Sequence, residues 1–198
     1  MRAGELERAV AVLRRGGVVA YPTDTLYGLA VDPRRDDAVA RLFAVKDRPA
    51  AMAVPLIAAD LGQAQAAGQF GGLELRLAHA FWPGPLSIVV PAAPVLATAV
   101  LGAGGTVAIR VPAHAVGRTL AAGLEFCVTA TSANLSGQPA TASPVDVAAA
   151  LGSRIDLLLD DGPAPGGPPS TIVACGPEGP MLVREGPIAW ERVLKSLQ

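Results

Sequence analysis

The chain is poor in cysteine, in aromatic residues and in lysine. Its 198 residues include two cysteines and two histidines, and these four do not have the spacing of a zinc site. Cys127 and Cys175 each lie inside an apolar segment. We therefore interpret both as free thiols of a protein kept in a reducing cytoplasm.

Strong charge and long apolar runs are also missing. The formal net charge is −1, whereas a strong nucleic-acid binder is usually basic. No apolar run is long enough to cross a bilayer, and the charged start MRAGELERAV predicts a helix rather than a signal peptide. The P-loop and Gly-x-Gly-x-x-Gly patterns are absent, so a nucleotide would bind in another way. We expect a cytoplasmic protein with no membrane partner.

Apolar periodicity predicts helices that alternate with strands along the chain. The expected helices cover residues 5–15, 36–46, 60–67, 72–81 and 144–151, with two more that begin at His114 and at about residue 188. The expected strands cover residues 17–22, 55–57, 86–90, 106–111, 126–131, 155–159, 170–174 and 181–184. This alternation predicts one α/β domain over residues 1–198, with a single twisted mixed sheet and flanking helices.

Lysine is rare in this chain, since only Lys46 and Lys195 are lysines among sixteen basic residues. The lysine in the interior of the sequence, Lys46, therefore calls for an explanation. Lys46 falls on the apolar face of the helix expected at 36–46, and Arg48 follows two residues later. An unpaired charge at such a surface costs several kcal/mol, so an anionic partner would explain both cations. The alternative is a lysine whose stem covers apolar surface while its ammonium stays in water.

Hydroxyl and amide side chains gather where predicted strands end. The segment YPTDTLYGL, residues 21–29, contains both tyrosines of the chain, and the segment TATSANLSG, residues 129–137, follows an apolar strand. Ligands of α/β sheets bind beside the carboxyl ends of strands, where turns of small residues let backbone N–H groups approach phosphate. Arg110 and Arg184 end apolar strands and suit carboxylate or phosphate, and Ser170 opens another strand. The alternatives are ordinary capped turns and solvated strand-end charges.

Six short motifs, in this order, resemble those of one family, the threonylcarbamoyl-AMP synthases with their YrdC-type domain. The motifs are GGVVAYPTDTLYGL, KDRP, FWPGPLSIVV, VAIRVPAH, TSANLSG and STIV, and the resemblance runs from about residue 16 to residue 186. It implies a twisted α/β sheet around a concave, positively lined ligand cavity, in a short member of the single-domain type. It also implies a reaction in which L-threonine, bicarbonate and ATP form threonylcarbamoyl-adenylate and release pyrophosphate.

The resemblance further implies partners and site residues. A separate tRNA threonylcarbamoyl transferase complex would use the product to modify tRNA, and weak tRNA binding by this chain stays an open alternative. ATP would arrive with Mg²⁺ held mainly by its phosphates, so no protein-bound metal is expected. The implied ATP contacts are Lys46, Arg48, Thr106, Ser132, Asn134 and Arg184, of which Lys46 and Arg48 are the expected catalytic residues. The implied threonine contacts are Thr23, Arg110, Ala130 and Ser170.

Three residues depart from the usual family pattern, and two other functions stay open. Met52, Ile57 and Ala140 replace common family residues, which bears on threonine affinity and on one phosphate contact. A related domain forms carbamoyl-adenylate in hydrogenase maturation proteins, but within a much longer chain that carries cysteine-rich zinc modules. A non-catalytic RNA-binding or translation-associated module would use the concave face as a basic groove, although the near-neutral charge offers little counterion release.

Overall fold

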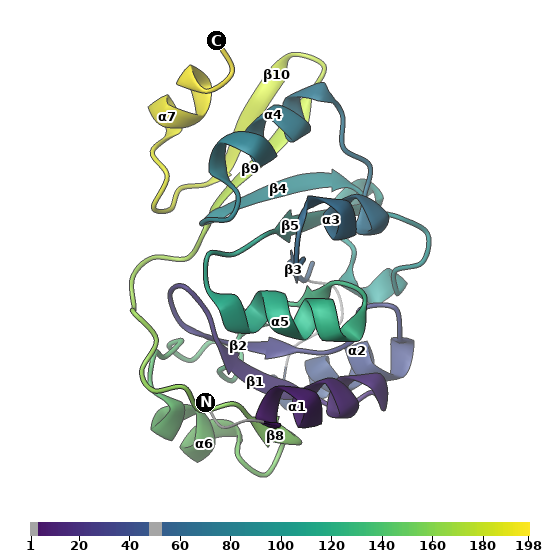
Figure 1. Ribbon diagram of the computed structural model, residues 1–198, viewed down its shortest axis with the longest axis vertical. Helices are drawn as coiled ribbons and strands as arrows, with labels where there is room; N and C mark the ends of the chain where they lie inside the picture. Colours follow the sequence, from purple (N-terminus) through teal and green to yellow (C-terminus); the bar gives the residue numbers. More distant parts are fainter. Residues whose placement is uncertain (1–3, 48–52) are drawn as a thin grey trace.

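The computed structural model describes residues 4–47 and 53–198, in which the strands form two sheets (Figure 1). A four-stranded sheet has the order β7-β2-β1-β8, and a six-stranded sheet has the order β10-β9-β4-β5-β3-β6. The strands of the first are β1 (Val19–Pro22), β2 (Tyr27–Ala30), β7 (Thr131–Ser132) and β8 (Leu157–Leu158). Those of the second are β3 (Leu56–Ile57), β4 (Leu86–Pro91), β5 (Thr106–Arg110), β6 (Val128–Thr129), β9 (Thr171–Gly176) and β10 (Gly179–Arg184).

Both sheets are mixed, which confirms the predicted α/β class, but the prediction of a single sheet is wrong for the described residues. In the first sheet β1 pairs antiparallel with β2 and parallel with β8. In the second, β4 pairs antiparallel with β5 and parallel with β9. The segment expected as one strand at 126–131 divides into β6 and β7, which belong to different sheets. The chain therefore links the two sheets at Ala130.

The α-helices begin within two residues of the positions expected from periodicity, and the five for which an end was also predicted end within one residue of it. They are α1 (Glu5–Arg14), α2 (Asp36–Val45), α3 (Leu61–Ala67), α4 (Gly72–Phe81), α5 (Ala115–Leu124), α6 (Pro144–Leu151) and α7 (Trp190–Lys195). Helix α5 packs against α1 and β1, and α4 packs against β4 (Figure 1). Within the described residues, no helix has both the length and the apolar character that a membrane crossing needs.

Local sequence explains several of these boundaries. At the start of α6, Ser143 accepts a hydrogen bond from the Asp146 amide at 3.3 Å, and Pro144 occupies the first turn. At the start of α3, the Asp60 carboxylate accepts from the Gln63 amide at 2.8 Å. Between α1 and β1, a Cβ on Gly17 would lie 2.5 Å from Val12 Cγ1, so this close turn requires glycine.

Strand β2 was absent from the sequence-based expectation. It runs back beside β1, with Pro22 opposite Tyr27 and Val19 opposite Ala30. All four residues of β2 are buried, so the strand has no alternation of polar and apolar side chains by which to recognise it. The turn of the segment YPTDTLYGL is therefore short, and Tyr27 already belongs to a strand.

The two sheets are held together by one buried threonine at the end of β6. Thr129 Oγ1 accepts from the Val31 amide at 2.9 Å and donates to the Leu29 carbonyl at 3.1 Å. The Thr129 amide donates to the Val31 carbonyl at 3.2 Å, and the Tyr21 hydroxyl donates to the Thr129 carbonyl at 3.2 Å. Thr129 is fully buried, so these bonds form away from water. One residue of the six-stranded sheet thus binds both strands of the β1–β2 hairpin and the segment after it.

We predict that Thr129→Val lowers the free energy of unfolding by about 1–3 kcal/mol, because it leaves the buried Val31 amide without its acceptor. Urea denaturation of the wild type and the variant measures this. Thr119→Val is the matched control, since the Thr119 hydroxyl donates to the Ala115 carbonyl at an exposed position. The control should change the stability by less than about 0.5 kcal/mol. Equal effects of the two variants would contradict the prediction.

Candidate functional site

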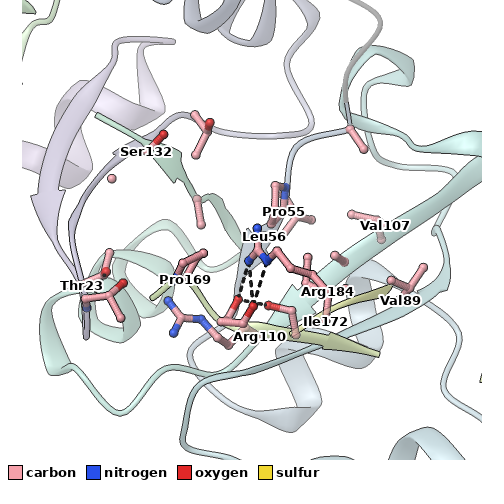
Figure 2. A pocket seen from close by; sticks show the side chains of 18 of the residues that line it. Thr23, Pro55, Leu56, Val89, Val107, Arg110, Ser132, Pro169, Ile172 and Arg184 are labelled. Atoms are coloured by element: carbon pink, nitrogen blue, oxygen red, sulfur yellow. Dashed lines mark hydrogen bonds between the residues drawn. The ribbon is translucent and has the colours of Figure 1, made fainter. Parts of the chain in front are cut away.

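A cavity of about 680 Å³ lies where the two sheets meet. Its walls come from the turn after β1 together with β2 and β7 on one side, and from β3, β4, β5, β9 and β10 on the other. Figure 2 shows Thr23 and Ser132 across the cavity from Val89, Val107 and Ile172. The volume falls within the roughly 300–1,000 Å³ range of small-molecule pockets.

The structure brings together most of the side chains proposed from the sequence. Seven of those ten line the cavity, namely Thr23, Thr106, Arg110, Ala130, Ser132, Ser170 and Arg184. Lys46 and Asn134 are described but are not among its lining residues, and Arg48 lies outside the described residues. Of the departures from the family pattern, Ala140 lines the cavity, Ile57 is fully buried in the core and Met52 lies outside the described residues.

Arg110, at the end of β5, is a buried cation that already has an anionic partner. Its Nη1 donates to Asp24 Oδ2 at 2.8 Å. The other oxygen of Asp24 accepts from the His114 amide, at the N-terminus of α5. A carboxylate is favoured there by the helix dipole as well as by Arg110. Asp24 thus ties the turn after β1 to both β5 and α5, a role that its place in a hydroxyl-rich turn did not reveal.

Arg184 approaches the same cavity from β10 and binds the start of β9. Its Nε and Nη2 donate to the Ser170 carbonyl at 3.1 and 2.8 Å, and Nη2 also donates to Ser170 Oγ at 3.2 Å (Figure 2). The register of β10 shifts between Leu182 and Arg184, and such a bulge breaks the alternation of side chains. Val183 and Arg184, although consecutive, both line the cavity. Burial, with the nearby charge of Arg110, lowers the pKa of Arg184.

Ser87 is a further polar residue of the cavity that the sequence analysis missed. Its hydroxyl lies 2.9 Å from the Ser170 hydroxyl, and the residue is only 2% exposed. A single serine within the apolar strand LSIVV was the available signal, because a buried hydroxyl needs a hydrogen-bond partner. Ser87, Ser170 and Arg184 form one connected polar chain along the cavity wall.

The two tyrosines of the segment YPTDTLYGL stabilise the wall of the cavity. The Tyr27 hydroxyl donates to the Gly162 carbonyl at 2.7 Å, and the Tyr21 hydroxyl donates to Thr129 as described above. Burial raises the pKa of each phenol above its ordinary value. In the turn itself, Thr23 Oγ1 donates to the Leu26 carbonyl at 2.7 Å. These hydroxyls stabilise the backbone, which accounts for the concentration of tyrosine in this segment.

Lys46 ends α2 and is buried, with 3% of its surface exposed. Its ammonium donates to the carbonyl oxygens of Ser132 and Asn134, the latter at 2.8 Å, and to Asn134 Oδ1 at 3.4 Å. The sequence correctly predicted that Lys46 lies on a buried face, but the hydrogen bonds described here go to neutral oxygens of β7 and of the segment after it. Its expected contact with phosphate stays a prediction.

The described residues offer no other obvious centre for chemistry. They contain no group of three or more His, Cys, Asp and Glu side chains that could hold a metal ion. Both cysteines are free, as expected from the sequence. Burial raises the pKa of Cys127 to about 12 and that of Cys175 to about 11, so neither thiol is an activated nucleophile.

Comparison with known proteins identifies close relatives of the chain. The family model for Sua5, YciO and YrdC proteins, described as "Telomere recombination", matches residues 11–186. The "Threonylcarbamoyl-AMP synthase" of Bacillus subtilis (strain 168) is 35% identical over 191 residues, which are 96% of this chain and 55% of that protein. The protein of the same name from Halorhodospira halophila is 41% identical over 157 residues, 78% of this chain and 81% of that protein.

Solved structures agree with the sequence comparison. The crystal structure of P. abyssi Sua5 complexed with L-threonine matches this chain with a TM-score of 0.91 and 34% sequence identity. The match covers 97% of this chain and 57% of that one. The chain therefore spans little more than half the length of the Sua5 protein and of the B. subtilis relative.

We predict that Asp24→Ala lowers the free energy of unfolding by about 2–4 kcal/mol, because it leaves the buried charge of Arg110 without a counter-ion. Asp37→Ala is the control, since Asp37 and Arg35 form an ion pair at an exposed position. Loss of such a surface pair changes stability by at most about 1 kcal/mol. Urea denaturation at neutral pH compares the two. A difference of less than 1 kcal/mol between the variants would show that the Asp24–Arg110 pair is not a structural link.

Proposed function

The chain belongs to the family of Sua5, YciO and YrdC proteins, and we propose that it is an L-threonylcarbamoyladenylate synthase. In this proposal it forms threonylcarbamoyl-AMP and pyrophosphate from L-threonine, bicarbonate and ATP. A separate tRNA threonylcarbamoyl transferase complex in the cytoplasm would then use the product to modify tRNA. Residues 1–198 would act as one domain, and this cavity would hold the ligands.

The observation that carries the proposal is the convergence of distant motifs on one cavity. Thr23, Arg110, Ser132, Ser170 and Arg184 come from widely separated parts of the sequence, yet all line the same space. Two guanidinium groups and several hydroxyls suit a ligand with a carboxylate and phosphates. The relatives named threonylcarbamoyl-AMP synthase and the relative solved with L-threonine support this choice of substrates.

We assign the amino-acid end of the site to Arg110. A guanidinium has several N–H donors, and Nη1 is the one that donates to Asp24. The others are suited to the carboxylate of threonine, in a charge-assisted contact. Asp24 keeps the guanidinium fixed, so the carboxylate would meet a preoriented donor. Thr23, Ala130 and Ser170 complete this part of the wall in the proposal.

The nucleotide end would lie toward Thr106, Ser132 and Arg184. The amine of threonine and bicarbonate first form a carbamate with loss of water. A carbamate oxygen then attacks the α-phosphorus of ATP, the bond to the β-phosphate bridging oxygen breaks, and pyrophosphate leaves with that electron pair. Fixed cations lower the barrier because negative charge builds up on phosphoryl oxygens. Arg184 is suited to this role, and Arg48 is assigned to it by the resemblance alone.

Magnesium would enter as part of the ATP substrate. Mg²⁺ is commonly held by phosphate oxygens and water, with few protein ligands. The site residues would then contact the phosphates of the Mg²⁺–ATP complex rather than the metal.

The proposal is tested by measuring pyrophosphate release with ATP and bicarbonate, while each amino acid is added in turn. Threonine should give the largest rate, and omission of bicarbonate should abolish release. If no amino acid stimulates release, and the protein instead binds RNA with an affinity that falls steeply with salt, then the non-catalytic RNA-binding alternative is correct.

We predict that Arg110→Ala raises the threonine KM by roughly thirty- to a thousand-fold, because a charge-assisted contact to the carboxylate is lost. The ATP KM should change by less than about three-fold, since the proposal assigns the nucleotide to other residues. Arg35→Ala, at an exposed ion pair, is the control and should leave both constants unchanged. A wild-type threonine KM in the folded Arg110→Ala protein would rule out this assignment.

A further inference from the structure

The segment at residues 132–138 takes its shape from two side chains. One is Asn134, whose Nδ2 donates to the Leu135 carbonyl at 2.9 Å and to the Gln138 carbonyl. The other is Lys46, whose ammonium donates to the Ser132 and Asn134 carbonyls and to Asn134 Oδ1. Asn134 and Lys46 therefore bind each other as well as the backbone of the segment.

The contact between Lys46 and the segment is reciprocal. The Ser136 amide donates to the Lys46 carbonyl at 2.8 Å, while the Lys46 side chain reaches back to Ser132 and Asn134. Both the backbone and the side chain of Lys46 thus fix the segment on the end of α2. Ser132, at the start of the segment, lines the cavity, whereas Lys46 and Asn134 are not among its lining residues.

We propose that Lys46 is a positioning residue, which holds residues 132–138 in the shape that binds the nucleotide and does not itself contact the phosphates. The inference rests on the proposed function in one respect, namely that Ser132 and the backbone beside it bind ATP. It differs from the role that the family resemblance implies for this lysine, because the structure gives its hydrogen bonds to the protein.

The number of donors favours this role. An ammonium has three N–H groups, and three oxygen atoms of the described segment lie within hydrogen-bond distance of it. Moving the ammonium to a phosphate would break these contacts: the Ser132 carbonyl would keep the Asn134 amide as a donor, at 3.0 Å, whereas the Asn134 carbonyl would lose its 2.8 Å hydrogen bond to Lys46. Hydrogen bonds lost inside the protein are unfavourable, so ATP would have to compensate for these contacts to recruit this cation. Arg184 already lines the cavity and needs no such exchange.

The test compares ATP affinity and local backbone exchange in Lys46→Met and Lys195→Met. Methionine keeps much of the length of the lysine side chain and removes the ammonium, and Lys195 is the other lysine of the chain, exposed at the end of α7. We expect Lys46→Met to weaken ATP binding about ten- to a hundred-fold and to speed amide exchange at Ser136 about ten-fold or more. Lys195→Met should change neither.

A double-mutant cycle with Asn134→Ala separates positioning from direct contact. If both side chains act by ordering one segment, each single variant weakens ATP binding and the double variant is at most about three-fold weaker than the weaker single one. Additive losses would mean that Lys46 acts on ATP independently of the segment, which overturns the proposal. Faster exchange at Ser136 with unchanged ATP affinity would also overturn it, because the role would then concern folding alone.

Two further outcomes remain decisive. If the wild type binds no ATP, the proposed function fails. Amide exchange at Ser136 then decides whether Lys46 orders the segment. Faster exchange in Lys46→Met supports this role, and unchanged exchange overturns it. If Lys46→Met does not fold, a crystal structure of the wild type with a non-hydrolysable ATP analogue decides. Nζ within hydrogen-bond distance of the Ser132 and Asn134 carbonyls supports the proposal, and Nζ on a phosphate oxygen overturns it.

Discussion

The passage of the chain from one sheet to the other at Thr129 and Ala130 is the constraint on which the site depends. The Thr129 side chain binds the backbone on both sides of Ala30, and the Ala130 amide donates to the Pro55 carbonyl at 2.8 Å. Neither sheet can shift along the other without breaking buried hydrogen bonds, each of which is expensive to lose. The cavity lies beside this joint between the sheets, since Ala130 is one of its lining residues.

Periodicity was sufficient for the helices because each buries one face and exposes the other. It was insufficient for the sheets. Residues 126–131, with the sequence FCVTAT, have the β-forming residues of one continuous strand, and nothing local indicates that pairing changes from β3 to β2 at Ala130. That change depends on backbone partners more than sixty residues away. Strand β2 escaped recognition for a related reason, since burial on both faces removes the alternation that marks a strand.

The sequence predicted which types of residue line the site better than it predicted their hydrogen-bond and ion-pair partners. An arginine that ends an apolar strand is conspicuous, and Arg110 and Arg184 both line the cavity. Their partners, Asp24 and Ser170, depend on how the β1–β2 hairpin and β10 pack in the fold. The sequence alone does not predict this packing. Lys46 illustrates the same limit. A buried ammonium needs oxygen atoms as hydrogen-bond acceptors. Whether those atoms belong to a ligand or to the protein backbone depends on the fold.

The two arginines of the cavity are unequal as anion sites. Arg110 has the charge of Asp24 beside it, whereas Arg184 donates its hydrogen bonds to the neutral oxygens of Ser170. Burial and the charge of Arg110 lower the pKa of Arg184, which means that the empty cavity disfavours this second cation. An anion bound between them would favour the charged form of Arg184 and so raise its pKa. Arg184, whose hydrogen bonds here go to neutral oxygens, is therefore better placed than the paired Arg110 to bind a further negative charge.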